Sequence, residues 1–293
     1  MATMRELKRR INSVQSSQKI TGAMKMISSA RFRKAEAAMN HALPYEEQLQ
    51  SILRHVNEKD CDYESSLRQE RTVRNAALVV LGTDEGLCGA FNINIYRKFL
   101  EAVNEYHAAQ VEPEVYPIGK KILGDIRRTR GIAEKKVPDV FANGPYAEAV
   151  QVLSDELIAR FREGKIDRAE VIYTHFKSRG TQVVKRLQLL PLKPRVPEEQ
   201  AGPDYTDKVL MYIYEPDCKE IFEILYPLVI RTMFYKALLE NRASEQAVRI
   251  LAMQMANDNA VKLLGSLQLE YNKLRQQGIT TELLDMAGGQ IEE

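Results

Sequence analysis

The residues best placed to do chemistry form the segment 82–92, which reads GTDEGLCGAFN. The segment follows a continuous apolar run and precedes a helical pattern, which is where a phosphate-binding loop lies in nucleotide-binding proteins. Its glycine spacing differs from the dinucleotide-binding fingerprint, no Lys-Ser or Lys-Thr pair of a P-loop follows, and Asp84 and Glu85 would repel a phosphate. A tight strand-to-helix turn is therefore the better interpretation, with nucleotide binding kept as an alternative.

Cys88 in this turn is a second candidate for chemistry, as a nucleophile. The chain has four histidines, and none stands in the spacing of a catalytic triad or a metal site: His41, His55, His107 and His175. No HExxH or CxxC motif and no paired-carboxylate arrangement stands out. We therefore predict a structural cysteine, no metal, no cofactor and no catalysis by this chain. Scattered spacing also predicts no disulfide framework and favours a reducing compartment for Cys61, Cys88 and Cys218.

Two long helical patterns at the ends of the chain must position these residues. Residues 1–57 have no proline before Pro44, and residues 217–288 contain only Pro227, which is expected to kink or restart the second helix. At 1.5 Å per residue each helix would span roughly 80–90 Å, and neither can bury a face alone. We therefore predict that the two helices pair as an antiparallel coiled coil.

The seam of this coiled coil is expected to fail in the middle of the first helix. A heptad begun at Leu7 places polar or charged side chains on the seam at Gln18, Thr21, Lys25 and Ser28. Close by, Met24 and Met26 are flexible apolar side chains, which can slide past a partner without locking. An ordinary amphipathic helix is the alternative, but the failing register favours a partner contact by Met24, Lys25 and Met26.

Between the helices the pattern changes to that of an α/β domain, at residues 75–215. Strands are predicted by β-type apolar runs at 76–81, 115–118, 171–176, 183–192 and 209–214. Helices are predicted at 91–107, 119–129 and 145–162. Strands that alternate with helices favour a Rossmann-like domain with a mostly parallel sheet.

The end of the second helix carries another candidate surface. Arg275, Gln276 and Thr280 alternate with apolar residues, which is typical either of a partner-binding face or of a solvated face opposite an apolar seam. The last apolar residues have no part of the first helix left to cover them: Leu283, Leu284 and Met286. An exposed apolar tip favours a sleeve formed by a partner.

Charge is unevenly distributed, although the net charge of the whole chain is only +2. Residues 1–40 carry nine basic and two acidic side chains, a net +7, whereas residues 239–293 carry five basic and eight acidic ones, a net −3. The two ends can therefore attract each other, and the first can also meet an acidic partner. No nucleic acid is expected, because residues 1–40 hold one aromatic side chain, Phe32. The longest apolar run, Ala76–Leu81, is too short to cross a membrane, so membrane association is expected only through a complex.

Three motifs, in order along the chain, resemble those of the gamma subunit of the rotary (F-type) ATP synthase. The first is INSVQSSQKIT at 11–21, which leads into AMKMI at 23–27, and the second is GLCGAFN at 86–92. The third runs from Ser244 to Ala260 and continues from Tyr271 to Thr280. The resemblance covers essentially the whole chain.

The resemblance implies a rotor shaft that is not itself catalytic. The paired helices would stand inside a ring of alternating alpha and beta subunits, and the central domain would lie at the foot with the epsilon subunit and the membrane-embedded c-ring. Ion flow would turn the shaft and force the beta subunits through their binding states. Met24, Lys25 and Met26 would lie near an acidic lever of a beta subunit, and Arg275, Gln276 and Thr280 would meet the beta catch loops.

Within the central motif, the resemblance implies a structural turn formed by Gly86, Cys88 and Gly89. Glu85 stands where the family usually has a basic residue. No cysteine pair occurs between Cys88 and Cys218, so the thiol-regulated insert of chloroplast members is absent. The resemblance is therefore to the bacterial type, which implies a peripheral subunit on the cytoplasmic face of the plasma membrane. The alternatives are a nucleotide-dependent enzyme that uses the turn and a passive coiled-coil adaptor.

Overall fold

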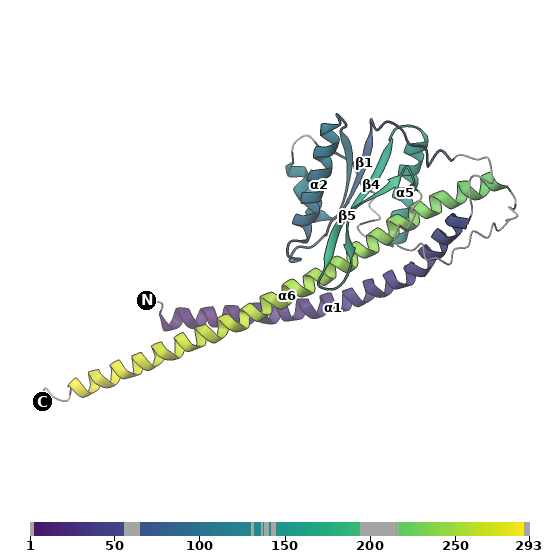
Figure 1. The fold of residues 1–293 in the computed structure, drawn as a ribbon. Coiled ribbons are helices and arrows are strands. Elements are labelled where there is room, and N and C mark those ends of the chain that lie inside the picture. Colours follow the sequence, from purple (N-terminus) through teal and green to yellow (C-terminus); the bar gives the residue numbers. More distant parts are fainter. Residues whose placement is uncertain are drawn as a thin grey trace, which may run out of the picture.

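Two long helices run side by side along most of the computed structural model, which describes residues 3–55, 65–129, 132–135, 137, 141, 145–193, 215 and 217–289. Helix α1 covers Met4–His55, with 52 residues, and α6 covers Cys218–Gly289, with 72 residues. They are antiparallel, and the C-terminal end of α6 extends well past the start of α1 (Figure 1). The predicted antiparallel coiled coil is confirmed.

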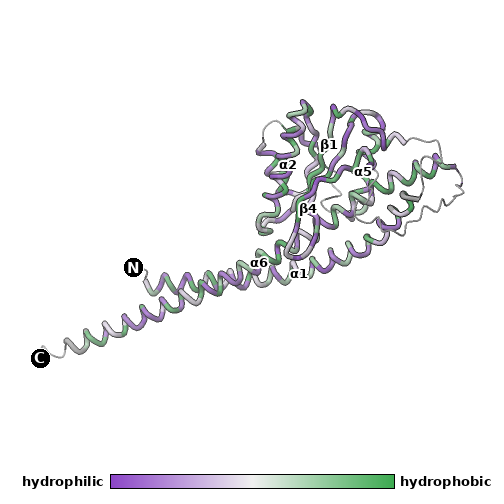
Figure 2. Tube along the Cα trace, viewed as in Figure 1, coloured by the Kyte–Doolittle hydropathy of each residue, from purple (hydrophilic) through white to green (hydrophobic). Residues whose placement is uncertain are grey.

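Three contact regions hold the two helices together. Near the free end, Leu7 and Ile11 of α1 pack against Leu267 of α6. In the middle, Phe32 fills the space above two alanines of α6, Ala243 and Ala247. Near the foot, Leu49 joins the main core cluster of the central domain. Apolar and polar residues alternate along both helices toward the free end (Figure 2), as expected where each helix buries a single stripe.

Prolines lie inside both helices without ending them. Pro227 was expected to kink or restart the second helix, and the restart is wrong, because α6 begins at Cys218 and includes Pro227. The kink stays a prediction. A proline inside a helix costs about 3 kcal/mol through the lost hydrogen bond and the ring clash. The neighbouring side chains of Tyr226, Val229 and Ile230 are buried in the main core cluster, and this packing outweighs that cost.

Within its described residues, the central domain holds a five-stranded sheet in the order β3-β2-β1-β4-β5. Its strands are β1 (Ala76–Leu81), β2 (Pro113–Ile118), β3 (Ala133–Glu134), β4 (Arg168–Phe176) and β5 (Gln182–Leu190). All neighbouring strands are parallel except β4 and β5, which are antiparallel. The predicted, mostly parallel α/β sheet is confirmed, whereas the strand predicted at 209–214 lies outside the described residues.

Helices cover both faces of this sheet: α2 (Phe91–Ala108), α3 (Lys120–Arg128), α5 (Tyr146–Arg162) and the N-terminal part of α6. Alternate residues of β1 point to opposite faces. Leu78 and Val80 belong to the cluster with α2, whereas Val79 belongs to the cluster that includes α5 and α6. The shaft helix α6 therefore shares its core with the sheet along its N-terminal part (Figure 1).

The cysteines correct one expectation. Cys88 is a free, buried thiol, but Cys218 is disulfide-bonded, and Cys61 lies outside the described residues. Scattered positions along a chain do not prevent pairing, because folding brings distant segments together. Cysteine spacing therefore gives no support for a reducing compartment. Among the residues that the structure describes, no helix is both long and apolar enough to cross a bilayer.

Candidate functional site

The predicted contact residues of α1 point in different directions. Met26 is 70% exposed, whereas Met24 and Lys25 are half-buried. Lys25 donates a hydrogen bond from its Nζ to Oε1 of Gln254 on α6, and Gln254 in turn donates to Asp258. The polar stretch of the heptad thus contacts α6 through the side-chain hydrogen bond of Lys25, and of the three predicted residues Met26 is the most available to a partner.

The predicted contact residues of α6 lie on its free part. Arg275, Gln276 and Thr280 are all exposed. Thr280 donates a hydrogen bond from Oγ1 to the carbonyl of Gln276 at 2.9 Å, so its hydroxyl is tied to its own helix. The tip beyond them is apolar and exposed, at 62% for Leu283, 67% for Leu284 and 72% for Met286.

The structure does not bring the two sets of predicted residues together. Lys25 contacts Gln254, and Gln276 lies 22 residues farther along the same helix. At 1.5 Å per residue, the two sets are separated by roughly 33 Å along the shaft. They form two separate candidate surfaces at different heights.

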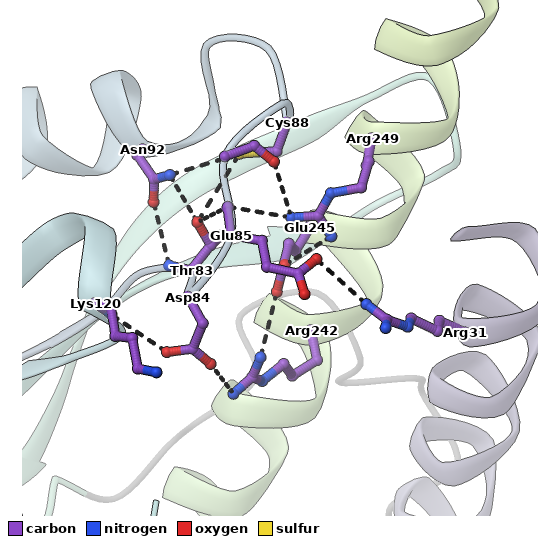
Figure 3. A network of polar contacts seen from close by, with 11 residues as sticks. Arg31, Thr83, Asp84, Glu85, Cys88, Asn92, Lys120, Arg242, Glu245 and Arg249 are labelled. Carbon is purple, nitrogen blue, oxygen red and sulfur yellow. Dashed lines mark hydrogen bonds and ion pairs between the residues drawn. The ribbon is translucent and has the colours of Figure 1, made fainter. Parts of the chain in front are cut away.

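The turn that follows β1 is held by its own side chains (Figure 3). Thr83 donates a hydrogen bond from Oγ1 to the carbonyl of Glu85 at 2.8 Å, and Asn92 donates from Nδ2 to the same hydroxyl at 2.7 Å. Leu87 and Gly89 adopt left-handed backbone conformations, with φ of 61° and 56°. The carboxamide and hydroxyl thus close a tight turn between the strand and α2.

The predicted turn residues lie in this structure as packing elements. Cys88 is buried, with its Sγ 3.5 Å from Nδ2 of Asn92. A Cβ at Gly89 would lie 3.5 Å from Cγ1 of Val248 on α6, and one at Gly86 would lie 3.6 Å from Lys121. At position 89 the positive φ favours glycine, whereas a Cβ there would make only an ordinary contact with Val248.

The alternative of a phosphate site fits this turn poorly. Asp84 accepts a hydrogen bond at Oδ1 from the backbone N–H of Lys120, at the start of α3. A carboxylate of the chain itself thus occupies a helix N-terminus that could otherwise bind an anion. Within the described part of the chain, no group of three His, Cys, Asp or Glu side chains could hold a metal ion.

Two arginines of α6, which the sequence analysis did not single out, bind the turn, and Glu245 of the same helix pairs with both of them (Figure 3). Arg249, only 2% exposed, donates from Nη2 to the carbonyls of Glu85 and Gly86, at 3.2 and 3.4 Å. Its Nη1 lies 2.8 Å from Oε1 of Glu245. Arg242 lies between Glu245 and Asp84, at 3.5 and 3.7 Å.

Burial and charge act in opposite directions on Glu245. Burial raises the pKa of its carboxyl group, and the neighbouring Arg242 and Arg249 lower it by less, so that the pKa lies above its usual range. The spacing of Arg242, Glu245 and Arg249 at three and four residues was the available sequence signal, because such residues share one helix face. A charged face is usually solvated, and here it is buried against the turn.

A second set of contacts joins the sheet to α6. The backbone N–H of Thr174 on β4 donates to Oδ1 of Asn241 at 2.9 Å, and the Ser244 hydroxyl donates to the carbonyl of Thr174 at 3.1 Å. Next to them, Nδ1 of His175 lies 2.6 Å from Oε2 of Glu240. The central domain is therefore attached to the same stretch of α6 through β4 and through the turn.

Comparison with known proteins places this architecture in a family. A family model described as ATP synthase matches residues 3–291. The ATP synthase gamma chain of Bacteroides fragilis is 41% identical over 294 residues, which covers 99% of this chain and all of the relative. That of Parabacteroides distasonis is 39% identical over 289 residues, covering 99% of this chain and 98% of the relative.

Solved structures agree on the fold. A chain in the Euglena gracilis mitochondrial ATP synthase (OSCP/F1/c-ring, rotational state 3) is 20% identical, with a TM-score of 0.63, and the match covers 97% of this chain and 92% of that chain. A chain of the Tetrahymena thermophila mitochondrial ATP synthase central stalk and c-ring is 21% identical, with a TM-score of 0.58, covering 81% and 99%. With a near-full-length family match and relatives around 40% identical, this chain belongs to the ATP synthase gamma-chain family.

Proposed function

We propose that this chain is the central rotor shaft of an F-type ATP synthase and is not itself catalytic. It couples ion flow across the membrane to ATP synthesis and hydrolysis in a ring of alternating alpha and beta subunits. The observation that carries the proposal is the build of α6. Its N-terminal part shares a core with the sheet, its middle pairs with α1, and its free C-terminal end extends past Met4.

The shaft surface suits a rotating part. Large exposed apolar residues are spread along the free part of α6 and gathered at its tip, and the chain contains no tryptophan, the residue most typical of tight interface anchors. A shaft that makes few deep side-chain contacts with the surrounding subunits can rotate among them. The apolar tip, formed by Leu283, Leu284 and Met286, is covered by a sleeve of the alpha and beta subunits.

The two candidate surfaces meet the beta subunits at different heights. The lower surface, nearer the central domain, is formed by Met24, Lys25 and Met26 and lies against an acidic lever of a beta subunit. The upper surface, nearer the free end of α6, is formed by Arg275, Gln276 and Thr280 and meets the catch loops of the ring. Support comes from the exposure of Met26 and of the whole upper set.

The remaining partners bind at the foot. The central domain contacts the epsilon subunit and the membrane-embedded c-ring, so the chain is peripheral and reaches the membrane only through the complex. In a bacterium, this places it on the cytoplasmic face of the plasma membrane. The sequence identity of 39% and 41% between this chain and the bacterial gamma chains named above supports this assignment.

Co-expression with the alpha and beta subunits of the same organism tests the proposal. We expect a stoichiometric complex whose ATP hydrolysis depends strongly on this chain. In the same assay, the chain in which Leu283 and Leu284 are both changed to Ser, which alters the exposed tip alone, should bind the ring less tightly. A chain that does not co-purify, and instead forms a stable homodimer, would support the passive coiled-coil adaptor.

A further inference from the structure

The turn at residues 82–89 is bound to the shaft helix by buried charge. Arg249 holds two successive carbonyls of the turn, those of Glu85 and Gly86. The guanidinium is 2% exposed, and its counter-ion Glu245 has a side chain only 4% exposed. A charge that is buried in this way persists only when its partners stay in place, because leaving it without them is strongly unfavourable.

The two carbonyls lie immediately before a strained residue. Leu87 has a φ of 61°, a conformation that leucine rarely adopts, and its side chain is 62% exposed. Packing of the leucine side chain therefore does not hold this conformation. The two hydrogen bonds from Nη2 of Arg249, with those of Thr83 and Asn92, hold the backbone around it.

Arg242 binds the other half of the same turn. Its guanidinium lies 3.7 Å from Asp84, 3.5 Å from Glu245 and 4.7 Å above the ring of Tyr146, at the start of α5. Asp84 in turn accepts a hydrogen bond from the N–H of Lys120 at the start of α3. One turn thus links the C-terminal end of β1, two helices of the central domain and the shaft helix (Figure 3).

We propose that this turn is the joint that fixes the central domain to the shaft against relative rotation, with Arg249 and Arg242 as its positioning residues. The inference rests on the proposed rotor function. Torque that enters at the foot reaches α6 through the shared apolar core and through polar contacts. These contacts include the Thr174 hydrogen bonds on β4 and this turn. The turn holds α6 through side chains seven residues apart, Arg242 and Arg249, and so resists twisting of the helix within the domain.

A third contact to the turn supplies a matched control. Arg31 of α1 lies 3.4 Å from Glu85, but both side chains are more than half exposed. Exposed ion pairs contribute little, because water screens them. Arg31→Gln therefore removes a charged contact with the same turn and leaves the buried joint intact.

Alkylation of Cys88 reports directly on the joint. The thiol is 3% exposed inside the turn and reacts only when the turn opens. We expect Arg249→Met, which keeps the length of the side chain but not its donors, to raise the rate of maleimide modification roughly tenfold or more in the full chain. Arg31→Gln leaves the rate unchanged. Mass spectrometry identifies the modified peptide, and a rate in Arg249→Met equal to wild type would overturn the proposal.

The second readout is coupling in the complete complex. In membrane vesicles, ATP hydrolysis by Arg249→Met continues while protons pumped per ATP fall at least twofold, and Arg31→Gln matches wild type. Unchanged pumping per ATP in Arg249→Met would refute the joint. If Arg249→Met fails to fold, Arg242→Gln takes its place, with the same two readouts. Failure of the wild-type chain to form a gamma-dependent ATPase would instead refute the rotor function.

Discussion

Lys25 of α1 donates a hydrogen bond to Gln254 of α6, although 229 positions separate them in the sequence. The contact fixes the relative height of the two helices at the point where the heptad pattern is weakest. It also engages the ammonium group of Lys25, the central residue of the segment predicted to contact the acidic lever. Met26, one position away, remains 70% exposed.

Met24→Lys should lower the efficiency of coupling. Met24 is half-buried beside Lys25, and a second cation there would make a charge-assisted contact with the acidic lever of the proposed beta partner. We expect fewer protons pumped per ATP hydrolysed, with hydrolysis itself retained. Met24→Leu is the control and should behave as wild type. Equal pumping ratios for the lysine and leucine variants would contradict this role of the lower surface.

Phe32→Ala should destabilise the chain by about 3–5 kcal/mol. The ring is 2% exposed, packs on Ala243 and Ala247 and lies 5.7 Å from the ring of Phe176. Truncation leaves a cavity that two alanines cannot fill. Urea denaturation followed by circular dichroism measures the loss. Tyr45→Ala removes a ring that is 53% exposed and should cost far less.

Gly89→Ala and Gly124→Ala should change the free energy of unfolding in opposite directions. Gly89 has a φ of 56°, a left-handed conformation that an L side chain adopts only at a cost, so alanine there costs about 1–2 kcal/mol. Gly124 lies inside α3, and a Cβ there would meet nothing within 4 Å. Alanine at 124 should therefore stabilise by about 0.5–1 kcal/mol. Thermal unfolding of both variants checks the pair, and a stabilised Gly89→Ala would rule out the strained turn.

Stability should fall as the pH rises from about 10 to 12, in part because of Tyr116. Burial raises the pKa of its hydroxyl from an ordinary 10.0 to about 12, with Arg160 opposing the effect. Between these values the unfolded chain loses a proton that the folded chain keeps, so stability decreases by at most about 1.4 kcal/mol per pH unit. Tyr116→Phe should show a shallower decrease in urea titrations at pH 9, 10, 11 and 12. Parallel pH profiles for the two proteins would disprove this assignment.

Changing Leu283 and Leu284 together to Ser should separate stability from assembly. Both side chains are more than 60% exposed, so the melting temperature of the free chain should stay close to that of wild type. Affinity for the alpha and beta ring should fall, because the proposed sleeve loses apolar area. Gamma-dependent ATP hydrolysis, titrated with each chain, measures the change. Wild-type affinity would show that the tip is not enclosed.

The main elements followed from apolar patterns. Ala76–Leu81 is buried at every position, which is why its unbroken apolar run identified a central strand. The two-residue β3, Ala133–Glu134, is too short for any pattern to reveal. The restart expected at Pro227 was wrong because local propensity cannot include the tertiary packing of Tyr226 and Val229.

The candidate site was predictable only in part. The exposure of the tip could be predicted because the second helix is longer than the first, so that no residue of α1 lies beside the tip to cover it. The burial of Arg249 could not be inferred, because a sequence pattern does not show whether a charged helix face meets water or the carbonyls of a distant turn. The Thr174 contacts with Asn241 and Ser244 were hidden for the same reason.

The shared core of the sheet and α6 has a consequence for how the protein is made. Val171 of β4 belongs to one cluster with Phe234 and Leu238 of α6. Ribosomes produce all five described strands before the helix that completes their apolar face. Until α6 has been synthesised, this face of the nascent sheet stays uncovered, and in that interval the chain most needs protection by a chaperone.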